Sequence, residues 1–247
     1  MPGPDAYILC TTPRSGSTLL CGLLRDSGVA GNPQSYFHRP DVATWRADLD
    51  LDKNAALSDI LAAAQQAGRR GTDIFGLRLQ RHSADFFFSQ LSQLHPGKHT
   101  DAERVTTAFG LTRYIYLTRD DKVAQAVSLV RAQQSGLWHR NADGTEHERT
   151  DPGEPLHYDA DAIAAELDTL TGYDAAWRDW FVREGIEPLH LTYADLVQDP
   201  QNTLLKILHF LQIDVAALPP VALSMGKLAD ATSDAWIAQF NGNRGGI

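Results

Sequence analysis

The fold is decided by residues 7–25, which read YILCTTPRSGSTLLCGLLR. The first four residues form a short apolar run, which is typical of one buried β-strand. The next eight residues are small or polar, and leucines then recur at helical spacing from Leu19 onward. This order predicts a strand, a tight loop and a helix.

The loop between that strand and that helix has the chemistry of an anion site. Backbone N–H groups at a helix N-terminus converge on one place and carry partial positive charge. Gly16 permits a close approach of the backbone, and Arg14 adds a full charge. Hydroxyl donors follow on Ser15, Ser17 and Thr18. The loop therefore predicts a cradle for a phosphate or sulfate group; the alternative is an ordinary strand-to-helix turn capped by Ser or Thr.

Composition indicates one α/β domain over residues 1–247. A chain of this length with 43% hydrophobic residues can bury a full core, and no internal repeat is visible. No stretch approaches the roughly 18 apolar residues of a membrane span, and no basic leader precedes the first strand. We therefore expect a cytoplasmic protein without a transmembrane segment. Cys10 and Cys21 fall in the first strand and helix, so we expect two small core residues rather than a disulfide or a zinc site.

The charge balance limits the partners. A formal net charge of −9 argues against a generic nucleic-acid-binding protein, so we expect no nucleic-acid partner. An anionic ligand must then be held by a local cluster of donors. The charge and composition leave the assembly open between a monomer and a homodimer.

A second strand-to-helix transition supplies another cation. Residues 111–118, LTRYIYLT, predict a strand that ends at Arg119, and valines then mark a helix that begins near Asp121 and carries Ser128. Parallel strands collect ligands at their carboxyl edge, so Arg119 is expected beside the first loop. Two such sites suit a nucleotide with two separate phosphate groups. Arg78, near the end of a strand at 72–79, is a third candidate cation, although a charge at a strand end is commonly just solvated.

The remaining chain completes an α/β pattern. Helices are predicted at 55–67, 84–94 and 160–183, a last strand at 186–192, and a helix through residue 211. The segment 34–41, QSYFHRPD, is either a ligand-lining loop or a surface loop with Tyr36 and Phe37 tucked into the core. The polar segment 133–155, which holds Trp138, is expected to be a long loop that acts as a lid or substrate wall.

Several segments together resemble a sulfotransferase that uses 3′-phosphoadenylyl sulfate (PAPS). They are TPRSGST at 12–18, YLTR at 116–119 leading to Ser128, and YADL at 193–196 followed by Asp-Pro at 199–200. More narrowly, GVAG at 28–31, followed by Pro33 and by Tyr-Phe at 36–37, is similar to the bacterial carbohydrate sulfotransferases that include trehalose 2-sulfotransferase. More weakly, Ser233 to Trp236 with Phe240 resembles a C-terminal element that covers the cofactor.

The resemblance implies a fold and an activity. The fold is a three-layer α/β/α architecture with a central parallel sheet, like that of P-loop nucleotide kinases. The activity is in-line transfer of a sulfuryl group from PAPS to a carbohydrate or glycolipid hydroxyl, with adenosine 3′,5′-bisphosphate as the product and no metal. By resemblance, Arg14, Ser15, Gly16, Ser17 and Thr18 hold the 5′-phosphosulfate, and Arg119 with Ser128 holds the 3′-phosphate.

The catalytic base is where the sequence departs from its relatives. Such transfer needs cations against the leaving phosphate, for which Arg14 and Arg78 are candidates, and a base for the acceptor hydroxyl. Trehalose sulfotransferase carries a glutamate at the position of Ser35, and serine is no base near neutral pH. Either His38 or Asp41 acts instead, or the acceptor has different chemistry, or the protein binds cofactor without efficient turnover. His38 is favoured for the near-neutral pKa of imidazole.

The acceptor is expected to contact Gln34, Ser35, Tyr36 and Trp138. Two rival functions remain at this point. A nucleoside-triphosphate kinase is disfavoured because the loop lacks G-x-x-x-x-G-K-[ST], with Ser17 where the lysine would stand. A non-catalytic nucleotide-binding protein stays open because of Ser35.

Overall fold

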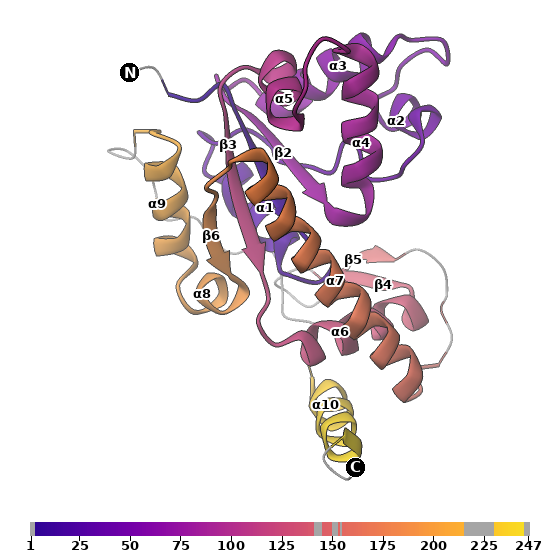
Figure 1. The fold of residues 1–247 in the computed structure, drawn as a ribbon. Coiled ribbons are helices and arrows are strands. Elements are labelled where there is room, and N and C mark those ends of the chain that lie inside the picture. Colours follow the sequence, from indigo (N-terminus) through magenta and orange to yellow (C-terminus); the bar gives the residue numbers. More distant parts are fainter. Residues whose placement is uncertain (1–2, 141–144, 150–152, 154, 215–229, 245–247) are drawn as a thin grey trace.

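The computed structural model describes residues 3–140, 145–149, 153, 155–214 and 230–244. In this part of the chain, four parallel strands form the central sheet in the order β2-β1-β3-β6 (Figure 1). They are β1 (Ala6–Thr11), β2 (Phe75–Gln80), β3 (Thr112–Thr118) and β6 (Leu189–Thr192). The four strands predicted from the sequence are confirmed, within a few residues at their ends.

Helices cover both faces of the sheet. One face packs against α1 (Ser17–Asp26), α8 (Tyr193–Gln198) and α9 (Pro200–Phe210). The other packs against α2 (Val42–Asp48), α3 (Leu57–Arg69), α4 (Arg81–Leu94), α5 (Asp101–Phe109) and α7 (Ala160–Glu184). Successive residues of a strand point to opposite faces, so Tyr7 and Leu9 belong to the first layer and Ile8 and Cys10 to the second. The three-layer α/β/α fold is confirmed.

The strand order places the candidate residues at one edge. After β1 the chain forms β2 on one side of it, and it then returns to form β3 on the other side. Ligands of open α/β sheets bind at the carboxyl edge where the connections change direction. The loop after β1 and Arg119 after β3 both lie at that edge, as expected.

The expectation for residues 133–155 was wrong in part. The helix α6 (Lys122–Ser135) is confirmed, but the segment expected to be a loop contains the antiparallel pair β4 (Leu137–Arg140) and β5 (Glu146–Arg149). Residues 141–144, 150–152 and 154 lie outside the described residues. The strands are only four residues long and largely polar, so their apolar pattern is too short to read.

The helices α2 and α5 were not predicted either. Asp41 caps α2, because its carboxylate accepts hydrogen bonds from Ala43 N and Thr44 N. The helix α5 opens with a capping box between Thr100 and Glu103, which is a signal that the sequence does contain.

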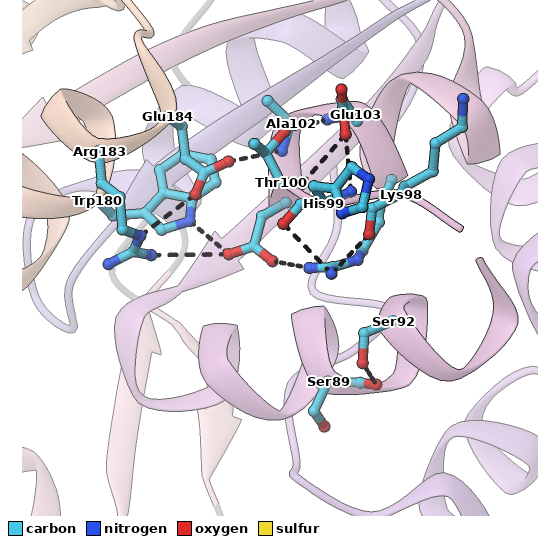
Figure 2. A network of polar contacts seen from close by, with 12 residues as sticks. Ser89, Ser92, Lys98, His99, Thr100, Ala102, Glu103, Trp180, Arg183 and Glu184 are labelled. Atoms are coloured by element: carbon cyan, nitrogen blue, oxygen red, sulfur yellow. Dashed lines mark hydrogen bonds and ion pairs between the residues drawn. The ribbon is translucent and has the colours of Figure 1, made fainter. Parts of the chain in front are cut away.

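The position of α5 depends on α7 (Figure 2). Trp180 Nε1 donates to Asp101 at 3.0 Å, and the backbone N–H of Ala102 donates to the Glu184 carboxylate at 3.0 Å. Arg104 pairs with Asp101 at 2.9 Å. Because α5 leads into β3, this network anchors the amino-terminal end of that strand, away from the candidate site.

The C-terminal helix α10 (Ala231–Arg244) packs against α6 and α7. Trp236 and Phe240 are buried in that cluster, and Arg131 forms an ion pair with Asp230 at 2.8 Å. Packing therefore accounts for the two aromatic rings that the resemblance assigns to a cofactor cover.

Both cysteines are free and buried, as expected for core residues. Burial raises the pKa of both thiols, which keeps them in the protonated form. Among the described residues, no helix has the length and apolar content that a membrane crossing requires.

The turn after α1 positions the segment that continues to Ser35. Gly31 has φ +72°, and a Cβ there would lie 2.5 Å from Gly68 O and 2.7 Å from Ile74 O. The next residue, Asn32, donates its N–H to Gly68 O at 2.7 Å. The chain can pass this close to α3 and β2 only because residue 31 has no side chain.

This contact predicts unequal effects of two alanine substitutions. Gly28 also has φ +72° but has open space around it, so Gly28→Ala should cost only the left-handed backbone penalty, about 1–2 kcal/mol. Gly31→Ala adds a collision with two backbone oxygens and should lower the free energy of unfolding by clearly more. Urea unfolding of both variants measures the difference; equal losses would show that the turn relaxes freely.

Candidate active site

The loop after β1 is anchored in the core before it reaches solvent. Trp177 Nε1 donates to Thr11 O at 2.9 Å, and the hydroxyls of Thr11 and Ser15 are 2.5 Å apart. Thr11 and Ser15 are fully buried. The Ser15 hydroxyl is therefore engaged inside the loop, while Thr18 is half-exposed at its end.

The helix α1 begins without a side-chain cap. Its N-cap is Gly16, which has φ +89° and forms no side-chain hydrogen bond, so the alternative of a turn capped by Ser or Thr is wrong. A Cβ at residue 16 would lie 2.6 Å from the ring of Tyr193. Gly16 thus permits both the left-handed turn and the contact with Tyr193, and the start of α1 faces the carboxyl edge of the sheet.

Arg14 connects the loop to α6 and β4. Its Nε donates to Ser128 Oγ at 3.0 Å, and its Nη1 donates to Trp138 O at 2.6 Å. Its φ of +62° is uncommon for a residue with a side chain, so neighbouring contacts must hold this backbone in place. Arg14 and Ser128, predicted to bind different parts of one nucleotide, are direct neighbours.

Arg119 lies over Tyr193 beside the same loop. Its guanidinium is 4.7 Å from the centre of the Tyr193 ring, and its Nη1 is 3.4 Å from Arg14 O. Burial lowers the pKa of Arg119, yet a guanidinium remains charged at any physiological pH. Tyr193 is a site residue to which the sequence analysis assigned no role, although it opens the YADL segment.

Arg78 joins the start of α1 to the segment that carries Ser35. Its Nε donates to Ser35 Oγ at 2.8 Å, and its Nη1 donates to Thr18 Oγ1 at 2.9 Å. The backbone adds a parallel bridge between Gln34 and Leu77, with Arg78 N donating to Gln34 O at 3.0 Å. The chain at residue 34 thus runs along the outer side of β2.

Two of the arginines at this edge have no ion pair within the described part of the chain. No carboxylate of the described residues forms an ion pair with Arg78 or Arg119, although the chain as a whole is acidic. A partly buried cation is costly without an opposite charge. The arrangement therefore favours an anionic ligand at this edge.

The segment 34–41 is divided between the core and the surface. Phe37 is buried between Trp45 and Phe87, with ring centres 4.9 and 4.8 Å away, which confirms its core position. Tyr36 packs partly against the same core, and its hydroxyl donates to Asn32 O at 2.8 Å. Packing thus accounts for much of Tyr36.

His38 is exposed and lies against His82 at the start of α4, with ring centres 4.9 Å apart. Desolvation, and then the nearby His38, lower the pKa of His82, although part of its side chain reaches solvent. His82 is therefore neutral near pH 7. Asp41, the other candidate base, is engaged as the cap of α2, where the Thr44 hydroxyl and two N–H groups lower its pKa.

Trp138 meets the site through its backbone. Its carbonyl accepts the bond from Arg14, while its ring packs partly against the cluster formed by α6, α7 and α10.

A groove of about 620 Å³ opens beside Arg119, between α7 and the strands β3 and β6. Asp120, Asp174 and Glu187 also line this groove, whereas Arg14 and Arg78 do not, so it is not a space that the three arginines share. No group of three or more metal-binding side chains occurs among the described residues.

Comparisons with known proteins show the family to which the chain belongs. The chain is 28% identical over 260 residues to the trehalose 2-sulfotransferase of Mycolicibacterium smegmatis, covering 96% of this chain and 94% of the relative. It is 27% identical to that of Mycobacterium tuberculosis, covering 95% and 93%. The solved sulfotransferase domain from the Synechococcus PCC 7002 olefin synthase, 18% identical, superposes with a TM-score of 0.51 over 100% of this chain and 96% of that domain, which shows the fold. The family model of Stf0 sulphotransferase matches residues 6–243, so the chain belongs to this family and is a sulfotransferase.

Proposed function

We propose that the protein transfers a sulfuryl group from PAPS to a hydroxyl of a carbohydrate or glycolipid. The observation that carries this proposal is the meeting of Arg14, Arg78 and Arg119 at the carboxyl edge, where two of them lack a carboxylate partner in the described part of the chain. The curated relatives named trehalose 2-sulfotransferase support a sugar acceptor.

The donor is assigned to two neighbouring groups of residues. The uncapped start of α1, with Arg14, Gly16, Ser17 and Thr18, would hold the 5′-phosphosulfate. Arg119 and Ser128 would hold the 3′-phosphate. The Ser128 hydroxyl accepts a hydrogen bond from Arg14, so its own proton remains available to a phosphate oxygen.

The chemistry requires little beyond positioning and charge. The acceptor oxygen forms a bond to sulfur while the bond between sulfur and the bridging phosphate oxygen breaks, and negative charge develops on the leaving phosphate. Arg14, on the loop, and Arg78, which reaches from β2 to Thr18 at the start of α1, would stabilise that charge. The acceptor hydroxyl must lose its proton to a base during the same step.

We assign the base to His38. Ser35 accepts a hydrogen bond from Arg78, and its hydroxyl cannot take a proton near neutral pH. Asp41 is held by its cap contacts. His38 is exposed at the same sheet edge, beside a neutral His82. Gln34 and Ser35, next to Arg78, would contact the acceptor, with Tyr36 and Trp138 as supporting walls.

The first test distinguishes this nucleotide from ATP. Adenosine 3′,5′-bisphosphate should raise the melting temperature without magnesium, because its two phosphates match two groups of cations. A ligand at 100 times its Kd adds about 2.7 kcal/mol. ATP with magnesium should raise it little, since the loop has no lysine. A thermal-shift panel of both nucleotides decides; stronger stabilisation by magnesium-ATP would favour a kinase.

The second test separates donor binding from turnover. Arg119→Ala should weaken bisphosphate binding about ten- to a hundredfold, the usual loss for a charged hydrogen bond. Arg14→Ala should also lower kcat. Arg113→Ala is a matched control. Arg113 lies at the opposite end of β3 from Arg119, and its guanidinium stacks over the Phe210 ring of α9 at 4.9 Å. Calorimetry and labelled-sulfate transfer measure both effects; unchanged affinity in Arg119→Ala would remove that residue from the site.

The third test concerns the base. If His38 serves, the transfer rate should fall as the pH is lowered, because a protonated imidazole cannot accept the proton of the acceptor hydroxyl. His38→Ala should then abolish turnover and keep bisphosphate affinity, while His82→Ala stays active.

If no base is in place, Ser35→Glu should raise a slow rate on a trehalose-like sugar by part of the 10²- to 10⁴-fold that a base supplies. Tight bisphosphate binding with no transfer by any variant would leave a binding protein.

A further inference from the structure

Gln125, in the first turn of α6, contacts the loop that carries Arg14. Gln125 is fully buried, and its Nε2 donates to Thr12 Oγ1 at 2.9 Å and to Pro13 O at 2.6 Å. Those two residues immediately precede Arg14. The glutamine, separated from them by more than a hundred positions in the chain, therefore holds the backbone from which the arginine extends.

Lys122 determines which way the Gln125 amide points. An ammonium group only donates hydrogen bonds, and Lys122 Nζ is 2.9 Å from Gln125 Oε1, so the amide nitrogen must face the loop. The same Nζ donates to Arg119 O at 2.5 Å and pairs with Asp174 at 2.5 Å. Lys122 thereby fixes the amide and the backbone of Arg119 together.

This arrangement explains how Arg14 keeps an unfavourable backbone conformation. A non-glycine residue at φ +62° persists only where surrounding contacts over-determine it. The contacts on its N-terminal side come from Gln125, and Ser128, three residues further on the same helix face, receives its side chain. One face of α6 thus positions both ends of Arg14.

We propose that Gln125 is a positioning residue for sulfuryl transfer, oriented by Lys122 and Asp174, and that it sets the loop geometry on which donor binding depends. The inference rests on the proposed function for its readout. If Gln125 only joined a helix to a loop, its loss would lower stability without a selective effect on the donor.

The main experiment compares two methionine substitutions in full-length protein. Gln125→Met keeps the length of the side chain but removes its donors, and it should raise the Kd of adenosine 3′,5′-bisphosphate about tenfold and lower kcat, with the acceptor KM unchanged. Gln133→Met is the matched control: it removes an amide on the same helix that bonds Glu166 at 2.7 Å on the surface, and it should change neither constant.

A second variant provides a readout that a structural role would not give. Gln125→Glu keeps the shape and can pair with Lys122, but an ionised carboxylate cannot donate to Pro13 O. Because the Lys122 ammonium keeps that carboxylate ionised, the variant should lose bisphosphate affinity and kcat at least as much as Gln125→Met, with the acceptor KM unchanged. Lys122→Met should act in the same direction as Gln125→Met, and the double variant should be less than additive.

The outcomes separate the two proposals. If wild type binds the bisphosphate, and both Gln125 variants bind it equally well with only a lower melting temperature, the positioning role is wrong and the proposed function stands. Bisphosphate affinity that falls in Gln125→Met but not in Gln125→Glu would also contradict the role, because both substitutions remove the donor to Pro13 O. If wild type does not bind the bisphosphate at all, the proposed function itself fails.

Discussion

The site depends on the parallel pairing of β1 with both β2 and β3. This pairing sets Thr11 beside Gln80 on one side and beside Leu117 on the other, so the three strands all end at one edge of the sheet. The loop after β1 then has the start of α4 on one flank and Arg119 on the other. Trp177 reaches across from α7 to hold the last carbonyl of the strand. This hydrogen bond fixes the end of β1, from which the loop with Arg14 begins.

A second feature of that edge is a pair of arginines without an ion-pair partner among the described residues. The chain is acidic overall, yet the described carboxylates leave Arg78 and Arg119 without ion pairs. Each arginine instead contacts neutral groups: hydroxyls for Arg78, and an aromatic ring and a carbonyl for Arg119. These contacts orient a guanidinium without neutralising it. The positive potential therefore remains available to an anionic donor, which is the requirement that a sulfotransferase must meet.

Arg78 also connects the start of α1 to the segment that carries Ser35. It donates to Thr18 in the first turn of α1 and to Ser35 on the segment that runs along β2, so one side chain holds the two segments together. With serine at residue 35, Arg78 has a neutral partner there. Under the proposed function, the serine at residue 35 supplies neither a base nor a carboxylate partner for this arginine.

The sequence by itself determined the four strands and named three candidate arginines, because strand-loop-helix patterns and cations at strand ends are local signals, whereas the three layers were implied by the family resemblance. The sequence patterns did not predict α2 or the short β4–β5 pair, whose apolar patterns are too brief. The helix α5 was not predicted either, although Thr100 and Glu103 carry the signal of its capping box. Only the tertiary structure brought Tyr193 against Gly16 and Gln125 beneath Pro13. It also showed that the rings of Tyr36 and Trp138 pack partly against the hydrophobic clusters. These contacts join residues far apart in the chain, and their geometry depends on strand order and close packing, which no local pattern encodes.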